Sequence, residues 1–179
     1  DAVHENGRFT YANPGKIVFG PFADAGGGPD LERIGEALTR AGVPNEIPED
    51  ILRAMWWKFM VNVGINQTSA VLRAPYGIFQ SHPDALALMR SLMEEVVALA
   101  PTVGVDLRPE DIDAWEKVMM TLSPQSKTSM LQDVEAGRKT EVELFAGRVI
   151  SLGKIHGVPT PVNATMQRII KVIENGFGK

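Results

Sequence analysis

The stretch MWWKFMVNVGINQTSA, residues 55–70, lies in a helix that we predict over residues 49–72. Pro48 and two acidic residues mark its start, where the helix dipole favours negative charge. Between Trp56 and Asn66 its only polar side chains are Lys58, Asn62 and Asn66. Residues four apart on an α-helix drift by about 40° per step, so these three fall in one strip about 80° wide.

Three interpretations of this polar strip are open. The first is a solvated face on a surface helix, although such a face is usually wider and carries more than one charge. The second is a buried polar network between helices. Asparagine is a poor helix former, because its side chain competes for backbone hydrogen bonds, so two of them inside a helix need a reason. The third is a site, since lysine supplies a cation whose pKa falls on burial and asparagine offers both a donor and an acceptor. Such a set suits a small polar oxyacid.

The chain after residue 28 has helical periodicity almost throughout. Leu31, Ile34 and Leu38 have helical spacing, and Gly42 is a typical stop. We predict a loop over residues 73–85. Further helices are predicted over 84–103, 108–122, 126–156 and 163–174. The expected fold is an all-α helical bundle.

The first 28 residues have a different character. RFTYANPGKIVFGPF, residues 8–22, predicts a β-hairpin with strands at 9–11 and 17–19 around the NPG turn. ADAGGGPD then predicts a flexible junction. A lone hairpin is barely stable, so we expect residues 1–28 to be the end of an upstream α/β domain and residues 29–179 to form the helical domain.

Composition narrows the function classes. The formal net charge is −4, and no basic cluster indicates nucleic acid or an anionic membrane as a partner. The chain contains no cysteine, and its three histidines are scattered, so we expect no metal site. No apolar run approaches the roughly 18 residues that span a bilayer. We expect a cytoplasmic protein.

A second polar strip lies in the predicted helix 126–156. Ser129, Asp133 and Glu141 are spaced four and eight residues apart. Glu141 has a plainer interpretation as a surface partner of a neighbouring basic residue. Each glycine inside a helix costs about 1 kcal/mol relative to alanine, which close approach of another helix or a ligand would justify. Three glycines interrupt this helix: Gly137, Gly147 and Gly153.

These motifs resemble a known family. The pattern W-x-K-x-x-x-N-x-x-x-N, present as Trp56, Lys58, Asn62 and Asn66, resembles the helical-domain signature of ketopantoate reductase. SMLQD (129–133) followed by RKTE (138–141) is similar to its second signature, and the HGVPTP ending (156–161) is typical of the family. The resemblance extends from the predicted hairpin to the last helix.

The resemblance implies an enzyme of pantothenate biosynthesis that reduces 2-dehydropantoate to pantoate with NADPH. It implies a helical domain like that of 6-phosphogluconate-dehydrogenase-like reductases, following an upstream Rossmann domain. By position, Lys58 would be the general acid that protonates the keto oxygen. Asn62 and Asn66 would hold the hydroxyl and carboxylate end of the substrate, and Ser129 its carboxylate side. Glu141 would orient Lys58 and contact the nicotinamide end of the cofactor.

The chain departs from the family in what it lacks. The Gly-rich phosphate loop and the cofactor-domain asparagine that the family uses on the substrate are absent. We therefore expect that the chain alone neither binds NADPH tightly nor turns over. The expected partner is a small 2-keto acid, and a second copy of the chain is a further candidate through the helical domain. Two alternatives are a reductase of another 2-keto acid and a non-catalytic helical dimerisation module.

Overall fold

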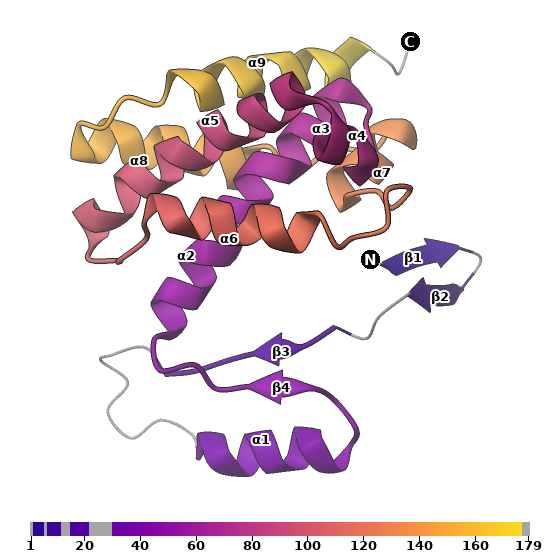
Figure 1. Cartoon of the computed structure of the whole chain (residues 1–179), viewed down its shortest axis with the longest axis vertical. Coiled ribbons are helices and arrows are strands. Elements are labelled where there is room, and N and C mark those ends of the chain that lie inside the picture. The colour runs from indigo at the N-terminus through magenta and orange to yellow at the C-terminus, as the bar shows by residue number, and fades with distance from the viewer. Residues whose placement is uncertain (1, 6, 12–14, 22–29, 177–179) are drawn as a thin grey trace. The chain divides into compact units, whose positions relative to one another are not determined.

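The computed structural model describes residues 2–5, 7–11, 15–21 and 30–176, shown as a coloured ribbon in Figure 1. The chain divides into two compact units, Asp1–Met55 and Trp56–Lys179. Most elements of the chain are helices, and every described element of the second unit is helical, which confirms the predicted all-α class.

The strands of the first unit pair differently from the prediction. Strand β1 (Ala2–Glu5) pairs antiparallel with β2 (Arg8–Tyr11) across Gly7, whose φ is 76°. Strand β3 (Ile17–Val18) instead pairs in parallel with β4 (Asn45–Glu46). The predicted hairpin of residues 9–11 with 17–19 is therefore wrong, because each of its strands has another partner. The predicted turn at 13–15 lies mostly outside the described residues.

Helix α1 (Leu31–Arg40) lies between β3 and β4 in the sequence and follows the prediction. The Asp30 carboxylate caps it by accepting the Arg33 N–H at 3.1 Å, and Gly42 follows the helix with a φ of 72°. The Asn45 side chain donates to the Gly35 carbonyl at 3.3 Å, which ties β4 to the helix. The compact units divide after Met55. The division after residue 28, between an upstream cofactor domain and the helical domain, stays a prediction.

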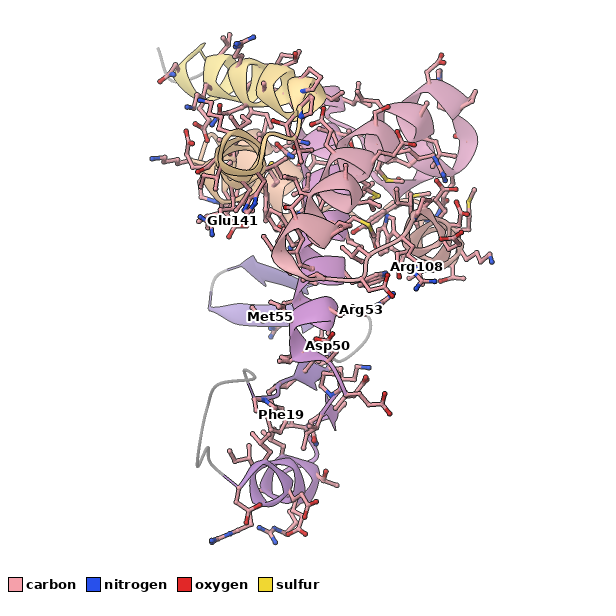
Figure 2. All side chains as sticks on the ribbon, turned by 90° about the vertical axis from the view of Figure 1, so that its left-hand side faces the viewer. Phe19, Asp50, Arg53, Met55, Arg108 and Glu141 are labelled. Carbon is pink, nitrogen blue, oxygen red and sulfur yellow. The ribbon has the colours of Figure 1, made fainter. Side chains whose placement is uncertain are left out.

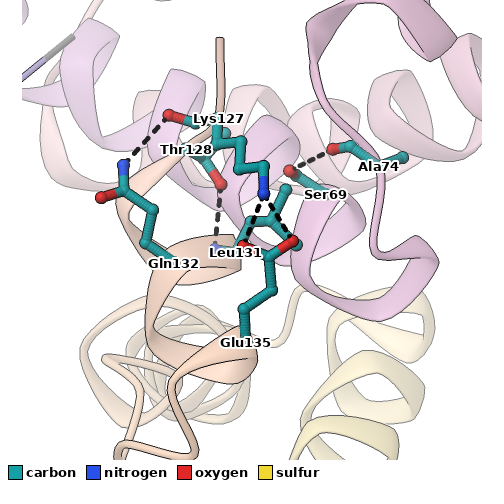
Figure 3. Close-up of polar contacts among 7 residues, drawn as sticks. All are labelled: Ser69, Ala74, Lys127, Thr128, Leu131, Gln132 and Glu135. Atoms are coloured by element: carbon teal, nitrogen blue, oxygen red, sulfur yellow. Dashed lines mark hydrogen bonds and ion pairs between the residues drawn. The ribbon is translucent and has the colours of Figure 1, made fainter. Parts of the chain in front are cut away.

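The predicted helix over residues 49–72 forms, but it is not one regular α-helix. It consists of α2 (Ile51–Val61), a π-helical turn η1 (Asn62–Asn66) and α3 (Gln67–Leu72). Arg73 then adopts the left-handed conformation with a φ of 49°. The Ser69 hydroxyl donates to the Ala74 carbonyl at 2.6 Å and holds this turn (Figure 3).

One segment that we predicted as a loop is partly helical. Helix α4 (Tyr76–Ser81) lies inside it. The N–H groups of Tyr76 and Gly77 donate to the carbonyls of Ser126 and Pro124 at 3.1 and 2.9 Å. These partners are distant in sequence, so tertiary hydrogen bonds support a short helix that the local sequence does not indicate.

The predicted helix over residues 126–156 is wrong as a single element. Helix α7 (Ser129–Glu135) ends before Gly137, whose φ of 64° suits glycine and breaks the helix. The chain resumes as a second π-helical turn, η3 (Glu143–Gly147), and continues as α8 (Arg148–His156). The remaining helical elements agree with the prediction to within a few residues: α5 (Pro83–Leu99), its 3₁₀ extension η2 (Ala100–Val103), α6 (Pro109–Met119) and α9 (Pro161–Gly176).

Helix α5 supplies the centre of the second unit's core. It contacts η1, α3, α4, α6, α8 and α9, and Figure 1 shows it between α9 and α6. Its buried apolar side chains are Ala85, Met89, Leu92, Met93, Val96 and Leu99. Each large one contributes about 1.5–3 kcal/mol of hydrophobic free energy. This core fixes the elements on which the predicted site residues lie.

Candidate functional site

Lys58 lies in the last turn of α2. Its side chain is exposed, but nearby protein removes part of the hydration of the ammonium, and this burial lowers the pKa of Lys58. No acidic residue in the described part of the chain forms an ion pair with Lys58 to offset that desolvation. The neighbouring Trp57 anchors the helix, since its ring packs edge to face on that of Trp115 at 6.3 Å.

The two predicted amides lie at the ends of the π-helical turn. Asn62 begins η1 and is half-buried, and Asn66 ends it and is buried. A π-turn closes with i→i+5 hydrogen bonds, so the drift calculated for an α-helix does not apply between these two residues. Such turns occur frequently at functional sites. The regular strip predicted from Lys58 to Asn66 is therefore distorted at the position of the two amides.

Ser129 is the first residue of α7, and its side chain is exposed. It does not cap the helix, because the preceding Thr128 hydroxyl oxygen accepts the Leu131 N–H at 3.2 Å (Figure 3). An ion pair at 2.8 Å between Lys127 and Glu135 spans the same helix. Local contacts thus fix α7 without using the hydroxyl of Ser129.

Glu141 does not share a helix with Ser129, because the chain breaks at Gly137 between them. The neighbouring Thr140 is buried, and its hydroxyl and N–H both donate to Glu174 at 2.7 Å. The Glu141 side chain is exposed and extends from the surface of the helical unit (Figure 2). In the part of the chain that the structure describes, Glu141 forms no ion pair with Lys58.

The segments that carry the two signatures meet in space. The turn η1 contacts both α7 and η3. The segment with Asn62 and Asn66 therefore lies against the helix that begins at Ser129 and against the turn that follows Glu141. Lys58 lies one helical turn before Asn62 on the same continuous helix. The structure thus brings together the elements of the predicted site.

The sequence interpretation missed a run of buried polar residues after Asn66. Gln67, Thr68 and Ser69 have no exposed surface. Their side chains donate to main-chain carbonyls of the same helical segment or the turn after it, at 2.8, 2.8 and 2.6 Å. The sequence shows four consecutive polar residues, 66–69, in an otherwise apolar helix, which could have indicated buried polar contacts. Only Asn66 belongs to the family pattern.

The His, Asp and Glu side chains of the described residues form no group of three that could hold a metal ion. No helix among these residues combines the length and apolar composition that crossing a membrane requires.

Comparison with protein families gives a match over most of the chain. The family model described as ketopantoate reductase PanE/ApbA C terminal matches residues 50–174. A 2-dehydropantoate 2-reductase of Pyrobaculum aerophilum is 35% identical over 147 residues, which are 81% of this chain and 52% of the relative. Another, of Archaeoglobus fulgidus, is 28% identical over 175 residues, which are 98% of this chain and 58% of the relative. The chain spans about half the length of the curated relatives it matches.

Solved structures share the fold. A PanE/ApbA family ketopantoate reductase from Ralstonia eutropha aligns with a TM-score of 0.80 and 27% identity, over 94% of this chain and 54% of that one. A D-mandelate dehydrogenase in complex with NADH aligns with a TM-score of 0.89 over 99% of this chain and 60% of that one. Its identity is 18%, so this second likeness shows the fold alone.

Proposed function

This chain belongs to the ketopantoate reductase family, and we propose that it is the helical part of an NADPH-dependent enzyme that reduces 2-dehydropantoate to pantoate. The activity is proposed for the longer protein, because the chain spans about half the length of its curated relatives. The isolated 179-residue chain is expected to bind NADPH weakly and to be inactive.

The observation that carries this proposal is the match of residues 50–174 to the family, with Lys58 placed one helical turn before the π-turn that bears Asn62 and Asn66. Burial also lowers the pKa of Lys58. Reduction of a keto group places negative charge on its oxygen, which must receive a proton. A partly desolvated ammonium stabilises that charge and gives up its proton more readily than a hydrated one. We assign Lys58 the role of general acid.

The amides of η1 suit the polar end of the substrate. Asn62 is half-buried and Asn66 is buried, and they lie at the two ends of the π-turn. An amide both donates and accepts, which matches a hydroxyl and a carboxylate. We assign these contacts to Asn62 and Asn66, and a carboxylate contact to the exposed hydroxyl of Ser129. The contact of η1 with α7 supports a shared site.

Glu141 is the residue of this chain that we assign to the cofactor. Its carboxylate is exposed and, within the described residues, has no hydrogen-bond partner, so it is available as an acceptor. We propose that it orients Lys58 and contacts the nicotinamide end of NADPH, which supplies the hydride when bound. The parallel strands β3 and β4, joined through α1, are typical of α/β sheets and support a cofactor domain before the helical unit.

The test measures the NADPH absorbance of the longest natural protein that contains this chain. With 2-dehydropantoate, steady oxidation is expected. The matched control substrate is the same 2-keto acid without its hydroxymethyl group. Because the amides are assigned to the hydroxyl, the control is expected to react at least about 100-fold more slowly in kcat/KM.

Other results would assign a different function. Equal or faster reduction of the control, or oxidation only with another 2-keto acid, would identify a different reductase of the same fold. A preference for NADH over NADPH would overturn the proposed cofactor. A folded protein that binds neither nucleotide would overturn the enzyme and favour a dimerisation module.

A further inference from the structure

Three buried polar side chains connect the π-turn to two other helices. Gln67 on α3 donates through its side-chain amide to Oδ1 of Asn163 on α9 at 3.1 Å. The Asn163 side-chain amide donates in turn to Oε2 of Glu95 on α5 at 2.7 Å. The exposed fractions of Gln67, Asn163 and Glu95 are 0%, 0% and 9%. We call this chain of hydrogen bonds the Gln67–Asn163–Glu95 relay.

The direction of each bond in the relay is fixed. Gln67 Nε2 faces two acceptors, the Val63 carbonyl at 2.8 Å and Asn163 Oδ1. Asn163 Nδ2 also faces two acceptors, Glu95 and the Leu92 carbonyl at 3.3 Å. Flipping either amide would place oxygen against oxygen. The relay therefore has one hydrogen-bonded arrangement.

The carboxylate at the end of the relay is itself held by the main chain. Glu95 accepts the backbone N–H of Val162 at 2.7 Å and that of Asn163 at 2.9 Å, both in the first turn of α9. Hydrogen bonds between a carboxylate and backbone N–H groups at a helix start are charge-assisted and strong. Glu95 thus anchors the relay to two rigid helices, α5 and α9.

The other end of the relay is attached to the π-turn. Val63, whose carbonyl accepts from Gln67, lies between Asn62 and Asn66 in η1. A π-turn shifts the hydrogen-bond register of a helix by one residue. The side-chain amide of Gln67, on the following helix α3, adds a hydrogen bond to a carbonyl inside this turn.

We propose that the Gln67–Asn163–Glu95 relay positions the amides of Asn62 and Asn66 for the substrate. This inference rests on the proposed function. Gln67 and Asn163 act through the π-turn and contact no substrate, so they are positioning residues. A displacement of about 1 Å at a substrate-holding group costs on the order of 100-fold in rate, which gives the relay a kinetic effect.

The kinetic test compares two buried substitutions in the longer natural protein. Gln67→Leu removes the relay's bond to the π-turn. Ser69→Ala is the matched control, because it also removes a buried bond from α3, but that bond holds the Ala74 turn. Both variants are expected to melt at lower temperature. Gln67→Leu is expected to lower kcat/KM for the 2-keto acid by about 10- to 100-fold, and Ser69→Ala to leave it unchanged.

A second readout does not depend on catalysis. In ¹⁵N spectra of the 179-residue chain, Gln67→Leu is expected to shift or broaden the side-chain amide signals of Asn62 and Asn66, and Ser69→Ala to leave them in place. If wild type reduces no 2-keto acid, the proposed function fails, and the spectra still decide whether the relay sets the amides. Unchanged Asn62 and Asn66 signals in Gln67→Leu, or equal kinetics of the two variants, would overturn the inference.

Discussion

Gly64 of the π-turn and Met93 of α5 approach so closely that any side chain on Gly64 would require Met93 to move. A Cβ atom on Gly64 would lie 2.3 Å from Cε and 2.6 Å from Cγ of Met93. Met93 is fully buried, so its side chain has little room to move away. This contact seats the turn that carries Asn62 and Asn66 directly on the central helix.

Gly64→Ala is expected to destabilise the protein, although alanine is the better helix former. Helix propensity alone would stabilise the variant by about 1 kcal/mol, whereas overpacking a core costs about 1–3 kcal/mol. The measurement is the free energy of unfolding in urea, in wild-type and Met93→Ala backgrounds. Because Met93→Ala removes both clashing atoms, the glycine substitution should cost less there. Equal costs in the two backgrounds would contradict the close contact.

Gly153 and Gly147 make a matched pair within one helical segment. A Cβ on Gly153 would lie 2.6 Å from the Val158 carbonyl oxygen. Val158 is held there by a turn, in which its N–H donates to the Gly153 carbonyl at 2.9 Å. A Cβ on Gly147 would lie equally close to an atom, but that atom is the flexible end of Glu143. Gly153→Ala is therefore expected to lower the free energy of unfolding by about 1–3 kcal/mol.

Gly147→Ala is expected to be neutral or to stabilise by up to about 1 kcal/mol, because Glu143 swings aside and alanine favours the helix. Both free energies come from the same thermal or urea unfolding series. A Gly153→Ala variant as stable as Gly147→Ala would show that the Val158 turn moves freely.

Lys58 should make stability depend on pH. Burial lowers the pKa of Lys58 in the folded chain, so between that value and the ordinary lysine pKa near 10.4 the unfolded chain binds more protons. The free energy of unfolding then rises with pH across this window. Lys58→Met removes the desolvated charge, so its free energy of unfolding is expected to exceed that of wild type. This difference should be largest below the window and should vanish above it.

The check is urea unfolding of both proteins at a series of pH values from neutral to just above the ordinary lysine pKa. A Lys58→Met protein that is less stable than wild type throughout would mean that Lys58 forms a stabilising interaction in the folded state.

Local signals predicted much of the fold. Three helical segments end at a glycine with positive φ: α1 at Gly42, η2 at Gly104 and α8 at Gly157. All three agree with predicted helix ends. The break at Gly137 was missed because the helical periodicity continues on both sides of it. Helix α4 was missed because its first N–H groups bond to residues about 50 positions away.

The sequence yielded a list of candidate site residues, which stays a prediction, and it did not indicate their geometry. The spacing of Lys58, Asn62 and Asn66 indicated one helix, and the structure confirms that they share a helical run. The π-turn was not predictable, because the segment is apolar on nearly every side and the phase shift of about 100° from one extra residue therefore cannot be read. Asn163 was also missed, because its partners lie on two other helices and periodicity reports only one helix at a time.

The most direct test of the account is the rate of NADPH oxidation with 2-dehydropantoate by the longer natural protein, in wild type and Lys58→Ala. Lys117→Ala, an exposed lysine in the last turn of α6, serves as the matched control. Loss of a general acid costs typically about 10²- to 10⁴-fold, so kcat of Lys58→Ala should fall within that range, with Lys117→Ala at the wild-type rate. Equal kcat values for wild type and Lys58→Ala would contradict the assignment of Lys58 as the proton donor.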